Sequence, residues 1–324
     1  HQISLAQEPD LVVVAPATAN IIAKMANGIA DDLISTTLLA TPRPIVIAPA
    51  MNNGMWKAPA TQANMATLRE RGVHVVGPGS GYLACGDVDT GRMNEPEDIV
   101  EAICEVLNPV PQYLAGKRIV ITAGPTHEPI DPVRFIGNRS SGKMGIALAG
   151  EAARRGAAVT LVLGPTSLDV PHGVECVRVQ TAEEMLQAAL SAFQTADAAI
   201  CAAAVADYTP ATPADHKLKK ANERLDRIEL VETVDILAEL SRQKGERCVI
   251  GFAAETDNVV EYAQRKLARK GCDAIIANDV SRADSGFGTD TNKAWIVSKA
   301  GTQELPVLTK PQLADTILDL LQNL

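Results

Sequence analysis

Residues 118 to 145, RIVITAGPTHEPIDPVRFIGNRSSGKMG, set out the fold of the region around them. They begin with a run of apolar, largely β-branched residues, Arg118 to Ala123, which predicts a buried strand. They end in a turn rich in Gly and Ser, after which we expect a helix from Lys143 to Arg155. A strand followed by a helix is the repeating unit of a doubly wound α/β fold.

The end of this stretch differs from a phosphate-binding P-loop in one residue and in its context. Met144 stands where the P-loop pattern requires the Ser or Thr that holds magnesium. Fourteen residues also separate Ala123 from Asn138, whereas a P-loop joins its strand to its helix directly. A Gly-rich turn that opens a helix still suits an anion, although a plain helix start is the alternative. The residues of this turn are Ser140, Ser141, Gly142 and Lys143.

The same alternation of strands and helices extends along the whole chain. Strands are expected at 11–15, 44–48, 73–76, 118–123, 159–163, 174–179, 198–204, 249–253, 274–277 and 294–297. Helices are expected at 19–27, 31–39, 59–71, 143–155, 182–193, 234–243, 259–270 and 310–321. Only 3% of the residues are aromatic, so the cores must consist of Ala, Val, Ile and Leu, as in parallel sheets covered by helices.

The length of 324 residues predicts about two domains. The segment CEVLNPVPQYLAGK at 104–117 contains two prolines and loses its periodicity, which marks a boundary. We therefore expect domains at 1–110 and 111–324.

Composition excludes several classes of protein. The formal net charge of −9 argues against sequence-independent binding of nucleic acid. No apolar run has the length of a membrane span and no signal peptide is evident, so a cytoplasmic protein is expected. Six cysteines without a CxxC pair and five histidines without an HExxH motif argue against a zinc site. Three basic clusters are either solvated faces or anion sites: Arg134, Arg139 and Lys143; Lys217, Lys219 and Lys220; Lys266, Arg269 and Lys270.

Eight short motifs occur in a distinctive order. They are APATAN (15–20), APAMNNGMW (48–56), ACGD (84–87), the stretch at 121–145, AAAVADY (202–208), KLKK (217–220), GFAAET (251–256) and ANDV (277–280). In this order they resemble the bacterial bifunctional phosphopantothenoylcysteine decarboxylase/phosphopantothenate–cysteine ligases of coenzyme A synthesis. The resemblance covers nearly the whole chain. Only the N-terminal strand and the glycine-containing loop of that family have no counterpart in these residues. The resemblance implies a flavodoxin-like flavoprotein domain followed by a Rossmann-like ligase domain.

For the second domain, the resemblance implies a ligase that uses CTP and magnesium. The carboxylate of 4′-phosphopantothenate would attack CTP to form an acyl-cytidylate, which cysteine then attacks. Lys217 would stabilise charge on the triphosphate, Asn138 would act when cysteine attacks, and Arg134 would hold substrate. No ligand set for the magnesium is identified. The positions expected around the nucleotide are Ala203, Asp207, Asp235, Phe252, Lys266 and Lys270.

For the first domain, the resemblance implies an FMN-dependent decarboxylase. Oxidation of the substrate thiol would create an electron sink for loss of the carboxylate, which is chemistry that a flavin supplies. Asn20 would line the flavin site, Asn52 would bind the substrate carboxylate, and Cys85 would help to reduce the product. His1 would be the active-site histidine, although Gln2 makes this segment one residue longer than the family pattern. The resemblance also implies a homo-oligomer, a dodecamer built from decarboxylase trimers and ligase dimers.

Three other hypotheses stay open at this point. The first domain could serve only as an oligomerisation module beside an active ligase. The chain could be a non-catalytic regulatory subunit, which the joint presence of Asn138 and Lys217 disfavours. It could also be a dinucleotide-dependent oxidoreductase, although GPGSGY at 77–82 departs from GxGxxG and precedes no expected helix. The remaining histidines are expected to be surface or structural residues: His74, His127, His172 and His216.

Overall fold

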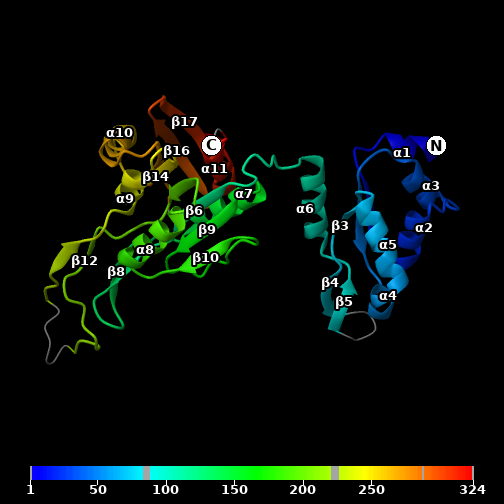
Figure 1. Ribbon diagram of the computed structural model, residues 1–324, viewed down its shortest axis with the longest axis horizontal. Helices are drawn as coiled ribbons and strands as arrows, with labels where there is room; N and C mark the ends of the chain where they lie inside the picture. The colour runs from blue at the N-terminus through cyan, green and yellow to red at the C-terminus, as the bar shows by residue number, and fades with distance from the viewer. Residues whose placement is uncertain (1, 83–87, 220–225, 287, 323–324) are drawn as a thin grey trace. The chain divides into compact units, whose positions relative to one another are not determined.

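The chain divides into two compact units, His1–Val110 and Pro111–Leu324 (Figure 1). The computed structural model describes residues 2–82, 88–219, 226–286 and 288–322. The division falls within the proline-containing segment at 104–117, but the first residues of that segment end helix α6, Pro96–Leu107. The expectation that periodicity is lost from Cys104 onward is therefore wrong by about one helical turn.

The first unit contains a parallel sheet with strand order β1–β2–β3. Its strands are β1 (Val12–Ala17), β2 (Ile45–Pro49) and β3 (His74–Val75). Its helices are α1 (Gln2–Gln7), α2 (Ala19–Asn27), α3 (Leu33–Ala40), α4 (Asn53–Lys57), α5 (Pro59–Glu70) and α6. Ile22 of α2, Ile47 of β2 and Met65 of α5 are fully buried together, so the core lies where these helices cover the sheet. The stretch GPGSGY contributes to a hairpin, β4 (Gly79–Tyr82) with β5 (Val88–Arg92), rather than to a nucleotide-binding loop.

The second unit is built on an eight-stranded sheet with strand order β10–β9–β6–β11–β14–β15–β16–β17. The strands are β6 (Arg118–Ala123), β9 (Ala158–Leu163), β10 (Glu175–Arg178), β11 (Ala198–Cys201), β14 (Cys248–Glu255), β15 (Ala274–Asp279), β16 (Thr291–Ser298) and β17 (Gly301–Thr309). The first six of this order pair in parallel, and β16 and β17 are antiparallel. The chain moves from β6 outward to β10 and then returns to β11 on the other side of β6. The strand order thus reverses between β6 and β11, where doubly wound folds bind their ligands.

Helices cover both faces of this sheet (Figure 1). They are α7 (Lys143–Arg154), α8 (Ala182–Phe193), α9 (Ile236–Gln243), α10 (Val259–Lys270) and α11 (Lys310–Leu318), followed by a 3₁₀ turn at Asp319–Leu321. Successive residues of β6 face opposite sides: Ile121 packs with α7 and α11, and Val120 packs with α8 and α9. Both faces of the parallel strands are therefore buried, which explains their continuous apolar runs.

The α/β prediction is confirmed in both units, and three predicted helices, 19–27, 182–193 and 259–270, have the bounds of α2, α8 and α10. Helices α1, α4 and α6, strand β17 and the hairpin β4–β5 were not predicted, nor were two hairpins of three-residue strands. These hairpins are β7 (His127–Pro129) with β8 (Phe135–Gly137) and β12 (Tyr208–Pro210) with β13 (Leu230–Glu232). Strands of three residues carry no measurable periodicity, so only their pairing defines them.

Among the described residues, no helix combines the length and the apolar character that crossing a lipid bilayer requires.

Candidate functional site

Three glycines bring main-chain segments into close contact at the carboxyl ends of β6 and β9. A Cβ on Gly164 would lie 1.8 Å from the carbonyl oxygen of Pro125, which only glycine avoids. A Cβ on Gly142 would lie 3.4 Å from the Cα of Gly124, and the φ angle of Gly142 is +82°. The start of α7 is thereby held directly against the end of β6.

The predicted Gly- and Ser-rich turn is present and opens α7. Gly142 is the N-cap and has no side chain with which to cap the helix. The hydroxyl groups of Ser140 and Ser141 accept hydrogen bonds from the N–H groups of Gly142 (3.3 Å) and Lys143 (3.4 Å). Thr166 donates to the carbonyl of Ser141 over 2.9 Å, which fixes the turn from β9's side. The positive end of the helix is therefore available to an anion at the edge of the sheet.

Asn138 lies where the strand order reverses. Its Nδ2 donates to the carbonyl of Ala204, just beyond β11, over 2.9 Å. The same carbonyl accepts from the N–H of Thr126, which follows β6, over 3.2 Å. Ala203, predicted to line the nucleotide pocket, is tied to β6 through its N–H, which donates to the hydroxyl of Thr122 over 3.4 Å. These bonds join the ends of β6 and β11 and place Asn138 at their junction.

Four of the residues predicted to surround a nucleotide meet beside β14. Asp235 caps α9 by accepting from the N–H of Ala238 over 2.9 Å, and it forms an ion pair with Lys270 of α10. Lys266, one turn earlier on α10, donates to the carbonyl of Phe252 over 2.7 Å, and its burial lowers the pKa of its ammonium. The structure thus brings together Asp235, Lys270, Lys266 and Phe252, although both lysines already have protein partners.

Lys217 and Asp207 lie on the connection that leads from β11 to α9. Both side chains are exposed. The main-chain carbonyl of Asp207 accepts a hydrogen bond from the N–H of Thr233 over 2.9 Å. The residue after Lys217, Leu218, is held through its main chain by Asp131 and Arg134. Asp131 was not predicted, because an Asp before a Pro in a loop usually indicates only a turn.

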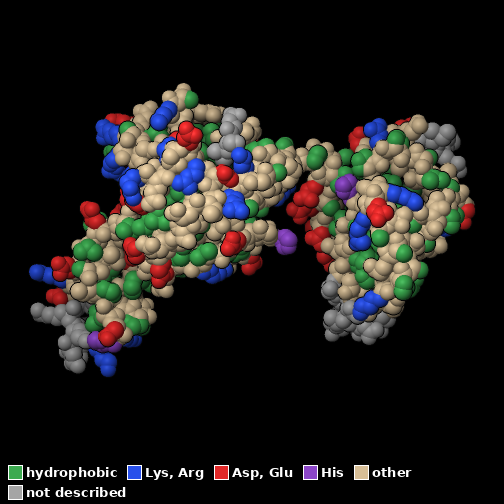
Figure 2. Space-filling view, in the orientation of Figure 1, with side chains coloured by type: hydrophobic (Ala, Val, Ile, Leu, Met, Phe, Trp, Pro, Cys, Tyr) green, Lys and Arg blue, Asp and Glu red, His purple; other side chains and the backbone are tan. Residues whose placement is uncertain are grey.

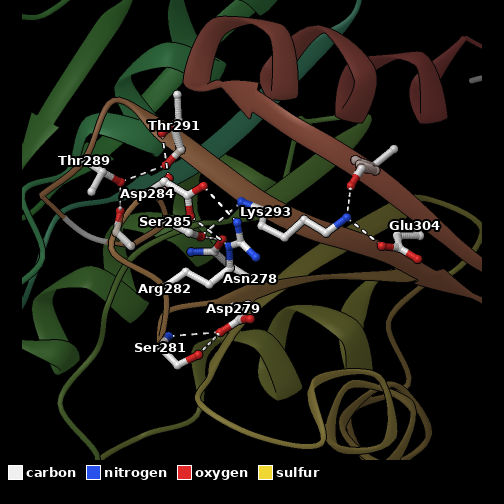
Figure 3. A network of polar contacts seen from close by, with 12 residues as sticks. Asn278, Asp279, Ser281, Arg282, Asp284, Ser285, Thr289, Thr291, Lys293 and Glu304 are labelled. Atoms are coloured by element: carbon white, nitrogen blue, oxygen red, sulfur yellow. Dashed lines mark hydrogen bonds and ion pairs between the residues drawn. The ribbon is translucent and has the colours of Figure 1, made fainter.

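Lys143 connects the start of α7 to the loop between β15 and β16. Its Nζ lies 2.7 Å from Asp290 Oδ1 and donates to the carbonyl of Gly288 over 3.2 Å. The loop itself is held by the polar network in Figure 3. Within it, the Ser285 hydroxyl donates to Asn278 Oδ1 over 2.9 Å and accepts from the N–H of Lys293 over 3.0 Å.

Lys310, at the start of α11, binds the same loop and was not predicted. It is 5% exposed and donates to the carbonyl of Gly286 over 3.1 Å and to Asn292 Oδ1 over 2.6 Å. Burial lowers the pKa of its ammonium to about 8. A lysine at a helix start is ordinary in a sequence, so no local signal distinguished this one.

In the first unit, Asn20 and Asn52 follow two neighbouring parallel strands. Asn20 is exposed in the first turn of α2, after β1, and Asn52 caps α4, after β2. The N–H of Ala50 donates to the carbonyl of Ala17 over 3.0 Å, so the two strand ends meet. A Cβ on Gly91 of β5 would lie 2.4 Å from the carbonyl oxygen of Met51, which places the hairpin β4–β5 against the Asn52 loop.

His1 and Cys85, the other two predicted residues of this unit, lie outside the described residues. Two histidines without an evident partner in the sequence have one in the structure. The ring of His127 stacks on Phe135 with a centroid distance of 3.7 Å, and burial lowers the pKa of its imidazole. His216 Nδ1 lies 2.7 Å from Asp215 Oδ1 on an exposed segment.

The residues present fit a flavin in the first unit. The amide groups of Asn20 and Asn52 offer both donors and acceptors, which match the alternating carbonyl and N–H groups at the edge of a flavin ring. Magnesium is a different case, because no group of three or more His, Cys, Asp or Glu side chains in the described part of the chain could hold a metal ion.

Comparison with known proteins identifies the family. Residues 1–108 match the family model Flavoprotein, and residues 114–324 match the DNA/pantothenate metabolism flavoprotein C-terminal domain. The coenzyme A biosynthesis bifunctional protein CoaBC of Bacillus subtilis is 49% identical over 98% of this chain and 78% of its own length. The chain belongs to this bifunctional coenzyme A biosynthesis family.

Other members of the family support both halves of the assignment. The protein of the same name from Escherichia coli K12 is 48% identical over 98% of this chain and 79% of its own length. The crystal structure of the C-terminal domain of a CoaBC protein covers 65% of this chain and 96% of its own, with 46% identity and a TM-score of 0.56. The predicted order of a flavodoxin-like flavoprotein domain followed by a Rossmann-like ligase domain is confirmed.

Proposed function

We propose that the two units catalyse successive steps of coenzyme A biosynthesis. The unit at 111–324 joins 4′-phosphopantothenate to cysteine at the expense of CTP, and the unit at 1–110 decarboxylates the resulting 4′-phosphopantothenoylcysteine with FMN. The observation that carries the ligase assignment is the placement of Asn138, which is bonded to Ala204 between β6 and β11 beside the start of α7. An amide and an anion-binding helix start then adjoin at the topological switch point.

Ligation proceeds through two nucleophilic substitution reactions. The carboxylate of 4′-phosphopantothenate attacks the α-phosphorus of CTP, pyrophosphate leaves, and an acyl-cytidylate forms. The amine of cysteine then attacks the acyl carbon, and CMP leaves with the bonding electron pair. The ammonium of Lys217 offsets charge on the phosphate oxygens in the first step, and the Asn138 amide orients the acyl group in the second. Magnesium would accompany the triphosphate and offset part of its charge.

Decarboxylation depends on the amide groups after β1 and β2. Bound FMN supplies the electron acceptor for the substrate thiol. Asn52 binds the carboxylate that is lost, and Asn20 contributes to the wall of the flavin site. Visible flavin absorbance together with release of carbon dioxide distinguishes this activity from a unit that serves only for oligomerisation.

The chain forms a homo-oligomer through exposed apolar surfaces, which in soluble proteins mark interfaces. Figure 2 shows hydrophobic side chains gathered on the end of the ligase unit that carries β8 and β12. The exposed apolar residues there are Val133, Phe135, Tyr208, Ile228, Leu230 and Val231. In the other unit, α3 exposes Leu33, Ile34 and Leu39. Ligase dimers and decarboxylase trimers would combine into a dodecamer, and a monomer in sedimentation at micromolar concentration contradicts this.

The roles of Lys217 and Asn138 are tested by separating the half-reactions. Lys217→Gln removes the charge but keeps hydrogen bonding, so pyrophosphate release from CTP and 4′-phosphopantothenate should fall by about a hundredfold. Asn138→Asp should release pyrophosphate once per site and accumulate the acyl-cytidylate, because the step with cysteine is impaired. Chromatography with and without cysteine follows both products, and an unchanged melting temperature of the ligase unit is the control for folding. A normal rate for Lys217→Gln, or no intermediate with Asn138→Asp, refutes the assigned roles.

A further inference from the structure

The carboxylate of Asp131 joins two segments that are far apart in the sequence. Its side chain is fully buried, with 0% exposed. One oxygen, Oδ1, accepts from the N–H groups of Val133 and Arg134, each over 2.8 Å, and so closes its own turn. The other oxygen, Oδ2, accepts from the guanidinium of Arg134 and from the N–H of Leu218, 87 residues later, over 3.1 Å. The two oxygens therefore have different tasks, one local and one long-range.

Arg134 completes the hold on Leu218. Its Nη2 donates both to Asp131 and to the carbonyl of Leu218, the latter over 2.8 Å. Both main-chain polar groups of Leu218 are thus bound by one ion pair. A further main-chain bond, from the N–H of Ala214 to the carbonyl of Ile130 over 2.9 Å, ties the same two segments. The guanidinium also holds the pKa of the Asp131 carboxyl well below its usual range, so the pair stays charged near neutral pH.

The residue held in this way directly follows Lys217. A lysine side chain has four rotatable bonds, so an exposed ammonium on a loose loop would sample many positions. Because the next residue is bound through both its N–H and its carbonyl, the main chain of the loop contributes little to this variation in position. A charged group that is already in position stabilises a transition state better than one that must first be moved into place.

We propose that Asp131 and Arg134 clamp the main chain of Leu218 and thereby position Lys217 for the attack on CTP. Asp131 is a positioning residue, because it acts through Lys217 and does not contact the reacting atoms. This inference rests on the function proposed for Lys217. It also gives Arg134 a role that was not predicted from the sequence, since its Nη2 donates to Asp131 and to the carbonyl of Leu218.

The Asp131→Asn variant should weaken the contact with Leu218 while it leaves the local turn at Val133 and Arg134 intact. The amide retains one oxygen for Val133 and Arg134, so the turn can still close. Its NH₂ group then faces the Arg134 guanidinium and the N–H of Leu218, and donors oppose donors. Asp215→Asn is the matched control, because Asp215 is an exposed carboxylate on the same segment that pairs only locally with His216.

A double-mutant cycle with Lys217→Gln tests the coupling. Asp131→Asn should lower kcat/KM for pyrophosphate release on the order of tenfold in the otherwise unchanged chain, and by less than about twofold in the Lys217→Gln background. Asp215→Asn should change neither value. Equal losses in both backgrounds overturn the inference, because Asp131 would then act without Lys217. A normal rate for Lys217→Gln alone instead refutes the proposed function of Lys217.

Limited trypsin cleavage tests the clamp independently of activity. Trypsin cuts after lysine only where the adjoining main chain can leave its hydrogen bonds. Cleavage between Lys217 and Leu218, identified by fragment mass, should accelerate on the order of tenfold in Asp131→Asn at an unchanged melting temperature, and not in Asp215→Asn. Unchanged cleavage overturns the proposal. If Asp131→Asn does not fold, Arg134→Lys gives the same test, because lysine keeps the charge but cannot bind both partners in the guanidinium's geometry.

Discussion

Asn52 in the flavoprotein unit and Asn138 in the ligase unit are both exposed amides that follow a strand, yet they are held in different ways. Asn52 Oδ1 accepts from the N–H of Gly54, two residues later, over 2.8 Å. Asn138 Nδ2 donates to Ala204, 66 residues later. The first arrangement is a local helix cap, and the second exists only once β6 and β11 lie side by side. The comparison shows that similar residues can owe their position to local or to tertiary structure.

The same difference extends to the surrounding charges. In the ligase unit, Lys143 pairs with Asp290, and Lys270 pairs with Asp235, in each case across separate elements. A highly charged nucleotide would therefore exchange existing ion pairs for new ones. In the flavoprotein unit, Asn20 and Asn52 carry no charge, so a ligand at these residues would be recognised through hydrogen-bond geometry. Three predictions test how far this contrast holds.

The largest effect is expected from Asn52→Asp. The carboxylate keeps an oxygen for the N–H of Gly54, so α4 remains capped, but it repels the substrate carboxylate. Decarboxylation should fall by on the order of a hundredfold or more, while ligation stays within about twofold. Product analysis with each unit's substrates measures both activities in one preparation. Parallel loss of both would mean that the unit is misfolded and that the local cap is not independent.

An intermediate effect is expected from two alanine substitutions on α7. A Cβ on Gly145 would lie 2.3 Å from the Cβ of Ala123 on β6, so Gly145→Ala should destabilise the ligase unit by about 1–3 kcal/mol. A Cβ on Gly150 would meet only Pro171 at 3.5 Å, and Gly150→Ala should stabilise it by about 0.5–1 kcal/mol through helix propensity. Denaturant unfolding measures both. Similar values for the two variants would show that contact between α7 and β6 does not shape the turn at the start of α7.

The most specific effect concerns Lys310 and pH. Its pKa is about 8 in the folded state and 10.5 in the reference state, so between these values the native state binds fewer protons than the unfolded one. Stability should therefore rise with pH across this window relative to Lys310→Met, by on the order of 2 kcal/mol. The neighbouring Lys143 lowers this pKa, and Asp290 raises it. Unfolding curves of both proteins at pH 8 and above 10 measure the difference, and parallel pH profiles contradict the expected burial of charge.

Much of the fold follows from local patterns. The buried strands of the second unit were predictable because their apolar runs are short and rich in β-branched residues, and the runs of β6 and β9 end directly before a glycine. The start of helix α8 was predictable because Thr181 and Glu184 form a capping box there. Strand β17 was missed because its side chains are mostly exposed and its partner, β16, decides its conformation.

The sequence by itself determined the fold class, the place of the domain boundary segment and the family, because periodicity, turn residues and ordered motifs are local features. Only the tertiary structure decided which residues of those motifs meet. Asn138 contacts Ala204, Lys143 contacts Asp290 147 residues later, and Asp131 holds Leu218. These contacts depend on the order of strands in the sheet, in which β6 lies between β9 and β11. No local pattern encodes that order, because it results from the packing of all the helices and strands together.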